Sequence, residues 1–397
     1  MTLPFAILAL IALALAIHPY LTYPLSLWVL AKILRHPQMP RAVLPLTRDS
    51  TPSNHDPALA ILLCVYNEEG IIDSRVKNLI EAASAIPDTE IRIYSDGSTD
   101  RTNDILKRFA GKTRVTLANE RLGKTHGMNT LVAQSRARIL VFTDAAVRMS
   151  SMSLLNILRH FDDAAVGCVC GRIVATADNT PGSNTASTIE TSAGYWSFDA
   201  FVRYVETKVA SAIGAHGPLF AIRSTLHEPV PTHLIDDFYV SMTVLNKGYR
   251  VVQANDVCGF KAVATRRSEE YARKVRIACQ AYNVHRLLVP QLKRQTWLIR
   301  YLYAGHKLLR WNTIFFLTAA ALFGSIALML SIGWEIVAGA WCLLALFILL
   351  GVAGLRPFSH GIDAMTALIA NGAGIIQSLR GASYQTWSSA QSARRAG

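Results

Sequence analysis

Long apolar stretches at the two ends of the chain constrain its fold more than any other feature of the sequence. The first covers residues 3–34 and contains no Asp, Glu, Lys or Arg before Lys32. Three more occur late in the chain, over residues 311–332, 334–355 and 362–379. A run of about 20 apolar residues is enough to cross a bilayer as a helix. We therefore expect an N-terminal transmembrane helix within residues 1–35 and C-terminal transmembrane helices within residues 311–380.

Basic residues flank these stretches on the side that faces the middle of the chain. They are Lys32, Arg35, Arg41 and Arg48 after the first stretch, and Lys293, Arg294, Arg300, Lys307 and Arg310 before the second. Short basic flanks stay in the cytoplasm. The sequence therefore predicts a multi-pass protein of the plasma (inner) membrane with a cytoplasmic central region. Three C-terminal spans would place the tail outside, whereas Arg380, Arg394 and Arg395 favour the inside, so the C-terminal topology stays open.

The formal net charge of +13 has two explanations. Basic side chains near the inner leaflet attract anionic lipid head groups, and a basic protein can instead bind nucleic acid. The basic residues concentrate at the membrane borders, and the sequence has no recognisable nucleic-acid-binding motif. We therefore expect these basic side chains to contact a lipid bilayer, and we expect no nucleic acid as a partner.

The region between the apolar ends alternates short apolar runs with helical patterns. Residues 36–57 contain five prolines among polar residues and are expected to form a linker. Strands are then expected over residues 58–65, 91–94, 114–117 and 139–142, with helices over residues 71–85, 100–109 and 124–135 between them. Strands separated by helices of this length form βαβ units. We therefore predict an α/β domain over residues 58–281 with a mixed, mostly parallel sheet.

Polar and acidic side chains follow these predicted strands, where parallel α/β sheets bind their ligands. They are Asn67, Glu68 and Glu69 after the first strand, Asp96 after the second and Asp144 after the fourth. Helix capping is the alternative role for such residues, and it is the role we expect for Ser98 and Asp100. The gathering of Asp96 and Asp144 at one edge of the sheet favours a nucleotide and metal site instead.

The segment Gly123-Lys124-Thr125 suggests a phosphate-binding loop. That loop requires a glycine five positions before the Gly-Lys pair, and Ala118 occupies this position. The phosphate-loop interpretation therefore fails. A lysine at the start of a helix can still contact a phosphate or a base with the help of the helix dipole, so Lys124 remains a candidate.

The strand ends resemble those of family 2 glycosyltransferases, which are inverting enzymes with the GT-A fold. The similar segments, in chain order, are CVYNEEG, YSDGSTDRT, NERLGKTHGMN, FTDAAV, GAHGPLFAIR, HLIDDFYVSMTVLNKGYRV and EEYARKVRIACQ. They cover roughly residues 56–290, and the apolar ends fit the membrane-bound branch that makes bacterial cell-surface polysaccharides. The resemblance implies a Rossmann-like domain that binds a nucleotide-sugar.

The resemblance also implies which residues contact the donor. They are Asn67, Glu68, Glu69, Asp96, Lys124, Asp144 and Arg273. The first loop and Asp96 would line the nucleoside pocket, and Lys124 would lie beside the base or the phosphates. Asp144 would be the first carboxylate of the DxD motif, which binds the diphosphate through Mg²⁺ or Mn²⁺.

Catalytic roles follow for Asp236, Asp237 and Arg276. Asp237 would match the last carboxylate of the TED-type motif and act as the general base toward the acceptor hydroxyl, with Asp236 beside it. Arg276 would match the arginine of the QxxRW-type motif and pair with the diphosphate. Without the resemblance, the acidic pair would be read as a helix N-terminus and the arginine as part of a solvated helix face.

Three positions depart from the family pattern. Ala146 occupies the second Asp of DxD, which leaves Asp144 as the metal ligand of that motif. Arg273 replaces the Gln and Ile277 the Trp of QxxRW, which puts processive polymerisation in doubt. His216, where many relatives have Asn, is expected near the acceptor.

We therefore predict a metal-dependent hexosyl- or N-acetylhexosaminyltransferase of cell-surface polysaccharide biosynthesis. It would transfer sugar with inversion from a UDP-sugar to a saccharide or lipid-linked acceptor. Residues 282–310 would form interfacial amphipathic helices, and residues 381–397 a basic tail. Polysaccharide export or assembly proteins are candidate partners.

Two alternatives remain. A polyprenyl-phosphate sugar transferase would use the same donor chemistry and make a lipid monophosphate sugar instead of an extended glycan. A non-catalytic membrane scaffold would keep only the fold. Ala146 favours the scaffold, whereas intact carboxylates at Asp144 and Asp237 oppose it.

Overall fold

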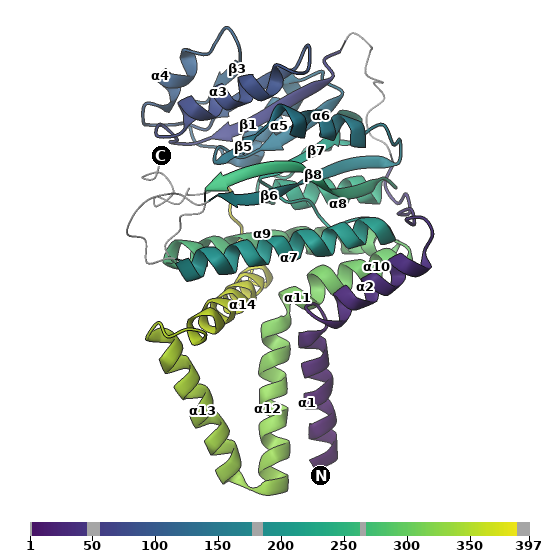
Figure 1. The fold of residues 1–397 in the computed structure, drawn as a ribbon, viewed down its shortest axis with the longest axis vertical. Helices are drawn as coiled ribbons and strands as arrows, with labels where there is room; N and C mark the ends of the chain where they lie inside the picture. The colour runs from purple at the N-terminus through teal and green to yellow at the C-terminus, as the bar shows by residue number, and fades with distance from the viewer. Residues whose placement is uncertain (1, 46–55, 177–185, 263–266, 387–397) are drawn as a thin grey trace.

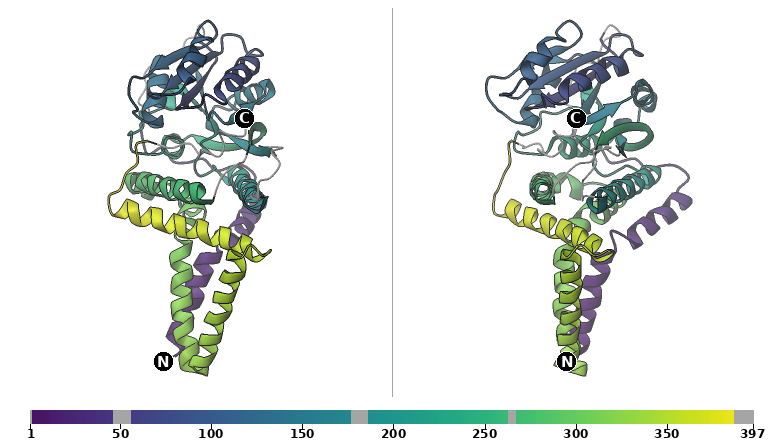
Figure 2. Two further views of the ribbon diagram at one scale, coloured as in Figure 1. Left: turned by 90° about the vertical axis from the view of Figure 1, so that its left-hand side faces the viewer. Right: turned by 60° about the vertical axis from the view of Figure 1, so that its left-hand side comes forward.

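The computed structural model describes residues 2–45, 56–176, 186–262 and 267–386. An α/β domain forms one half of the molecule, and a stem of long helices projects from it (Figure 1). Helices α7 (Ala186–Val209) and α9 (Arg267–Lys293) lie across the molecule between the sheet and the stem (Figures 1 and 2).

A mixed, eight-stranded sheet organises the domain, in the order β3-β2-β1-β4-β7-β6-β8-β5. Its strands are β1 (Leu59–Val65), β2 (Glu90–Ser95), β3 (Arg114–Leu117), β4 (Ile139–Thr143), β5 (Val147–Met149), β6 (Val166–Thr176), β7 (Leu219–Arg223) and β8 (Arg250–Ala262). β1 pairs in parallel with β2 and β4, and β2 with β3, whereas β7 is antiparallel to both β4 and β6. The predicted mixed, mostly parallel sheet is confirmed.

Every residue of β1 is buried, because helices cover both faces of the sheet. Adjacent strand residues point to opposite faces, so Ile61 packs in one apolar core and Leu62 in the other. The helices of the first core are α3 (Ile72–Ala83), α4 (Thr102–Lys107) and α6 (Ser151–His160), and those of the second include α5 (Lys124–Gln134), α7 and α8 (Asp236–Asn246). This double cover explains why the first strand reads as one continuous apolar run.

The N-terminal apolar segment is two helices rather than the single helix that we expected. Helices α1 (Thr2–Ile17) and α2 (Thr22–Ile33) meet at an angle of 61°. Pro19 lies in the break, and proline removes a backbone donor that a continuous helix would use. α1 runs alongside α12, while α2 turns away along the base of the domain (Figure 1), where Tyr23 and Leu27 are fully buried.

Three C-terminal helices are long and apolar enough to cross a membrane, and the bent α1–α2 pair would be a fourth span. They are α12 (Thr313–Ile332), α13 (Trp334–Val352) and α14 (Phe358–Leu379). α12 and α13 form the stem with α1, whereas α14 lies crosswise beneath α9 (Figure 2). A Cβ atom on Gly374 would lie 2.5 Å from the carbonyl oxygen of Val275, so glycine permits this close crossing of α14 and α9.

The expected linker and the end of the domain are both packed against their surroundings. Within the linker, Arg41 exchanges two hydrogen bonds with the Gln295 side chain, at 3.0 and 2.8 Å. Residues 46–55 lie outside the described residues. The predicted domain boundary at residue 281 falls inside α9, which continues to Lys293 and carries Pro290 within it.

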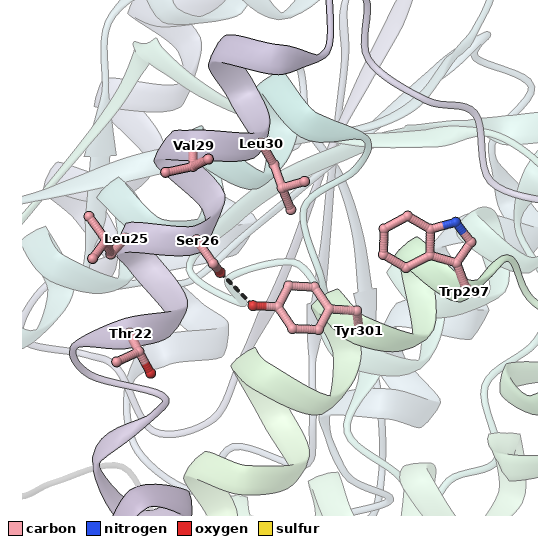
Figure 3. Close-up of a pocket in the computed structure, with 7 residues that line it drawn as sticks. All are labelled: Thr22, Leu25, Ser26, Val29, Leu30, Trp297 and Tyr301. Atoms are coloured by element: carbon pink, nitrogen blue, oxygen red, sulfur yellow. Dashed lines mark hydrogen bonds between the residues drawn. The ribbon is translucent and has the colours of Figure 1, made fainter.

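The segment after α9 forms short helices at the junction of domain and stem. These are α10 (Trp297–Tyr303), the π-helical turn η2 (Ala304–Leu308) and α11 (Leu309–Trp311). An apolar groove of about 450 Å³ lies between α2 and α10, where the Ser26 and Tyr301 hydroxyls meet (Figure 3). Trp297 at this groove is 65% exposed, as is typical of aromatic side chains at a membrane–water interface.

Candidate active site

Polar side chains tie together the loops that follow β1 and β2. The side-chain amide of Asn67 donates to Thr99 Oγ1 (3.1 Å), and its carbonyl oxygen accepts from the backbone N–H of Thr99 (2.8 Å). Glu69 Oε2 accepts from the backbone N–H of Arg101 (3.1 Å), and Glu68 is buried. The predicted nucleoside-contacting loop is therefore held in shape by its own side chains.

Asp96 is completely buried and holds the loop before α5. Its Oδ1 accepts from the backbone N–H groups of Leu122 (2.8 Å) and Gly123 (3.1 Å), and its Oδ2 accepts from Gly123 (3.0 Å). We expected Asp96 to line the nucleoside pocket, and that role stays a prediction; both of its oxygens accept hydrogen bonds from backbone N–H groups, which a buried carboxylate needs. Asp96 therefore positions the start of α5, and with it Lys124.

Lys124, the first residue of α5, joins two carboxylates. Its Nζ lies 3.0 Å from Asp144 Oδ1 and 3.5 Å from Asp236 Oδ2. Burial acts against the charge of Lys124, but Asp144, Asp236 and Asp237 together raise the pKa of this amine. In the same way Lys124 overcomes burial and lowers the pKa of Asp144. The ammonium and this carboxylate are therefore both charged at neutral pH.

The contact between α5 and the start of α8 brings these groups together. Thr125 Oγ1 donates to the carbonyl oxygen of Leu234 (3.0 Å), which ties α5 to the loop before α8. Asp236 and Asp237 form the first turn of α8. Carboxylates are favoured there by the helix dipole, so the position of the acidic pair has a local reason as well as a functional one.

Asp237 is partly exposed, whereas Asp236 is buried. Burial, and after it the neighbouring Asp236, raises the pKa of Asp237 to about 6. A Cβ atom on Gly217 would lie 2.5 Å from Asp237 Oδ2, so glycine is needed for this loop to approach the carboxylate. In the same loop, the carbonyl oxygen of Pro218 accepts from the backbone N–H of Asp144 (3.3 Å). The loop therefore links the two carboxylates.

His216 lies in this loop and is uncharged. Burial, and after it the nearby Arg203, lowers the pKa of His216 to about 3. Asp144 also acts on this pKa, so the ring lies near the carboxylates of the site. A neutral imidazole can donate or accept a hydrogen bond, which suits a contact with an acceptor hydroxyl.

Lys261 is a site residue that sequence reasoning missed. It pairs with Val147 in the register of β8 and β5, and it contributes to lowering the pKa of Asp144. Burial lowers the pKa of Lys261 itself. No motif marks this lysine, because its approach to Asp144 depends on the pairing of strands far apart in the chain.

Arg273 and Arg276 lie on α9, and their side chains have different partners. Arg273 forms a bidentate salt bridge with Glu270, from Nε to Oε2 (2.9 Å) and from Nη2 to Oε1 (2.8 Å). Arg276 donates to Gln280 Oε1 (3.1 Å), and burial and then Arg273 lower its pKa, while Asp236 acts in the opposite direction. Arg276 is therefore within electrostatic reach of the carboxylates, and Arg273 is held by its own helix.

Residues 382–386 run from α14 back to this site. The side-chain amide of Gln280 donates to the carbonyl oxygen of Tyr384 (2.9 Å). A side chain on Gly123 would collide with the carbonyl oxygen of Gln385. This segment therefore lies against the loop that precedes α5, on the domain side of α14.

A divalent cation fits the site only with help from the substrate. Among the described residues, no group of three or more His, Cys, Asp or Glu side chains could hold a metal ion. Mg²⁺, however, is commonly bound by one or two carboxylates plus substrate phosphates. Asp144 and Asp236 face the same ammonium, and Asp236 Oδ2 makes no hydrogen bond within the described residues. These two residues therefore fit a cation whose remaining ligands come from a diphosphate.

The family model described as Glycosyl transferase family 2 matches residues 60–229. Probable glycosyltransferase YdaM of Bacillus subtilis (strain 168) is 26% identical over 207 residues, which are 49% of this chain and 48% of the relative. Beta-monoglucosyldiacylglycerol synthase of Nostoc sp. is 30% identical over 118 residues, which are 28% of this chain and 25% of the relative. The chain thus spans about half the length of the first relative and a quarter of the second.

A solved structure has a similar fold over nearly the whole chain. The mannosyltransferase PcManGT from Pyrobaculum calidifontis, in complex with GDP-Man and Mn2+, has a TM-score of 0.66 and 21% identity. The similarity covers 94% of this chain and 99% of that chain, so it includes stem helices as well as the α/β domain. The predicted GT-A fold is confirmed. The match to the Glycosyl transferase family 2 model over residues 60–229 therefore lies within a domain of the GT-A fold, with the candidate active site at the carboxyl edge of the sheet.

Proposed function

We propose that the protein is a membrane glycosyltransferase that moves a sugar, with inversion, from a UDP-sugar to a saccharide or lipid-linked acceptor. The observation that carries the proposal is the partly exposed carboxylate of Asp237 next to the Lys124–Asp144–Asp236 cluster. Two comparisons support it. The mannosyltransferase of similar fold was solved with a nucleotide-sugar and Mn2+, and one relative is named for a glucosylated diacylglycerol.

The donor diphosphate would lie at the charged cluster. Lys124 would bind phosphate oxygens, and Arg276 would add a second cation from α9. A divalent cation held by Asp144 and Asp236 would supply positive charge to the diphosphate as it leaves. These groups would stabilise the charge that develops when the bond from the anomeric carbon to the diphosphate breaks.

Asp237 would be the general base. It would take the proton of the acceptor hydroxyl while the hydroxyl oxygen attacks the anomeric carbon from the face opposite the diphosphate. This single displacement inverts the configuration at that carbon. A pKa of about 6 leaves the carboxylate mostly ionised at neutral pH and makes it more basic than an exposed aspartate.

We further propose that α1, α12 and α13 cross the membrane and that α14 lies along its surface. α14 runs crosswise to the stem (Figure 2), and residues 382–386 return to the domain. The domain and this C-terminal segment would then share the cytoplasmic side. The arrangement accounts for a basic residue, Arg380, directly after α14, which three full spans would have placed outside.

A donor screen tests the proposed function. Purified full-length protein is incubated with a panel of UDP- and GDP-sugars, with and without Mg²⁺ or Mn²⁺, and nucleotide release is measured. We expect release from UDP-sugars that depends on the metal. Binding and release of no nucleotide-sugar would contradict the proposal and favour a scaffold. A lipid monophosphate sugar as the only product would favour the polyprenyl-phosphate alternative.

A further inference from the structure

A buried cluster of charged and polar side chains lies where the domain meets the stem. Its members are Tyr23, Asp199, Arg203, Glu206, His306 and Arg310. Asp199 lies within ion-pair distance of Arg203, Arg310 and His306. Glu206 accepts from the Tyr23 hydroxyl and lies 2.8 Å from His306 Nδ1. Both acids of the cluster are therefore already satisfied.

Lys307 adds a positive charge to this cluster, and no described carboxylate forms an ion pair with it. It lies in the π-helical turn η2, and such turns are frequent at functional sites. Its ammonium is 5.6 Å from the centre of the Phe238 ring and makes no hydrogen bond or ion pair with a described residue. Its stem packs on Gly214, where a Cβ atom would lie 3.4 Å from Lys307 Cε. Burial lowers the pKa of Lys307 to about 8.

Within the described residues, Arg203 also has an unused hydrogen-bond donor, its Nε–H group. Its side chain is 3% exposed, and its Nη2 pairs with Asp199, but its Nε has no hydrogen-bond partner in the described part of the chain. Arg203 lies close enough to Lys307 and to His216 to lower the pKa of both. This member of the buried cluster is therefore within electrostatic reach of His216 at the active site, and its Nε lacks an acceptor among the described residues.

Lys307 lies on a turn that adjoins both the element carrying the proposed base and a candidate membrane span. Phe238, which it faces, directly follows Asp237 in α8. Gly214 belongs to the same loop as Gly217, which touches Asp237. On the other side, η2 leads through α11 into α12, which is a candidate membrane span.

We propose that Lys307, with Arg203 beside it, binds the phosphate ester of a lipid-linked acceptor and so holds the acceptor hydroxyl at Asp237. This rests on the proposed glycosyltransferase function. A phosphate supplies the negative charge that the cluster lacks, and a lysine ammonium binds phosphate as a point charge. A lipid whose chain lies in the bilayer beside α12 carries its phosphate at this depth. An uncharged acceptor would leave this partly buried ammonium without an ion pair.

Binding of farnesyl phosphate to the full-length protein in detergent micelles tests the proposal. Farnesol is the uncharged control, and dioctanoyl phosphatidic acid represents an ordinary bilayer lipid. We expect Lys307→Gln to weaken farnesyl phosphate binding about 10- to 100-fold, since a hydrogen bond to a charged group is lost, and Lys307→Arg to weaken it far less. Lys293→Gln, at an exposed lysine near the end of α9, should leave it unchanged. Tighter binding of phosphatidic acid than of farnesyl phosphate would name a bilayer lipid as the source of the phosphate.

Equal affinity of the wild type and Lys307→Gln for farnesyl phosphate would overturn the proposal. If Lys307→Gln does not fold, a protection experiment on the wild-type protein tests the proposal instead. Farnesyl phosphate, but not farnesol, should protect Lys307 from acetylation by acetic anhydride, as read by mass spectrometry, and lack of protection would overturn the proposal. Nucleotide titration on the same preparations separates the two claims, because a protein that binds no nucleotide fails as a glycosyltransferase whatever Lys307 does.

Discussion

At the scale of single residues, the site depends on how three carboxylates share one ammonium. The Lys124 ammonium donates a hydrogen bond to Asp144 and lies 3.5 Å from Asp236, so these two carboxylates share one positive charge. Asp237 makes no ion pair with any residue that the structure describes, and its pKa is raised. Neighbouring acids with different environments can take different roles, and these environments support the proposed division into a charge-binding pair and a base.

The pH dependence of sugar transfer tests this separation. Asp237 must be deprotonated to act, and its pKa is raised to about 6. As the pH falls below that value the base becomes protonated, so kcat/KM should drop about tenfold per pH unit, while it should be flat above neutrality. Transfer rates and nucleotide affinity measured over the same pH series check it. A rate that stays constant well below pH 6 would rule out Asp237 as the base.

Asp144→Ala tests the donor side. The change removes a carboxylate that would hold the metal and frees Lys124 from its shortest ion pair. The Mn²⁺-dependent gain in UDP affinity should be lost, about a 10- to 100-fold weakening for one charge-assisted contact. Ala146→Asp is the companion variant and should keep or tighten metal-dependent binding. Full metal-dependent affinity in Asp144→Ala would show that the metal binds elsewhere.

Strand-end chemistry and family resemblance were enough to select the residues that meet in the site. Lys124, Asp144 and Asp236 come together as ion pairs, with Asp237 beside them. The resemblance did not reveal that both carboxylate oxygens of Asp96 accept hydrogen bonds from the loop before α5. That contact depends on which backbone N–H groups fold against the side chain. Lys261 was missed for the same reason, because only the sheet register places it near Asp144.

At the scale of helices and strands, local periodicity located the elements in the first half of the domain, although α3 (Ile72–Ala83) and α4 (Thr102–Lys107) are shorter than the helices expected over residues 71–85 and 100–109. The observed β1 (Leu59–Val65), β3 (Arg114–Leu117) and α5 (Lys124–Gln134) begin and end within a residue of their expected limits. Hydropathy does not encode direction, and so the bend between α1 and α2 and the crosswise course of α14 were not foreseen. Both depend on tertiary contacts, with α7 and with α9.

Gly374→Ala tests the crossing of α14 and α9. A methyl group at this position meets Val275 O and Ala278 Cβ, at 2.5 and 2.6 Å. Overpacking of this kind costs about 1–3 kcal/mol, so the Tm of the detergent-solubilised protein should fall. Gly339→Ala, in α13 with no neighbour within 4 Å, is the matched control and should leave the Tm unchanged or raise it. Equal Tm values for the two variants would contradict a tight crossing.

At the scale of the whole molecule, the stem and the domain differ in the kind of surface that they expose. The outward faces of α12 and α13 are apolar and exposed, whereas the junction above them contains charged residues and exposed tryptophans. Such a sequence of apolar stem, aromatic border and polar domain matches the layers of a bilayer and its surface. The site would then face the membrane surface on the cytoplasmic side.

Reporter fusions test the proposed topology. A reporter inserted at residues 51–56 and one placed after residue 386 should both report cytoplasm, because α14 is proposed to lie along the surface. A reporter after residue 333, between α12 and α13, should report the outside. An outside signal after residue 386 would mean that α14 crosses the bilayer, and an outside signal at residues 51–56 would contradict the whole arrangement.

The central claim is that Asp237 removes a proton from the acceptor while other residues hold the donor. Its most direct test is to measure UDP affinity and sugar transfer on the same preparations of wild type, Asp237→Asn and Asp236→Asn. Asp237→Asn keeps the shape of the side chain but cannot take a proton, so transfer should fall about 10²- to 10⁴-fold while UDP affinity changes little. Asp236→Asn should lose less transfer. Full transfer by Asp237→Asn would contradict the account, and a large loss in Asp236→Asn alone, with metal-dependent UDP affinity unchanged, would move the base to that residue.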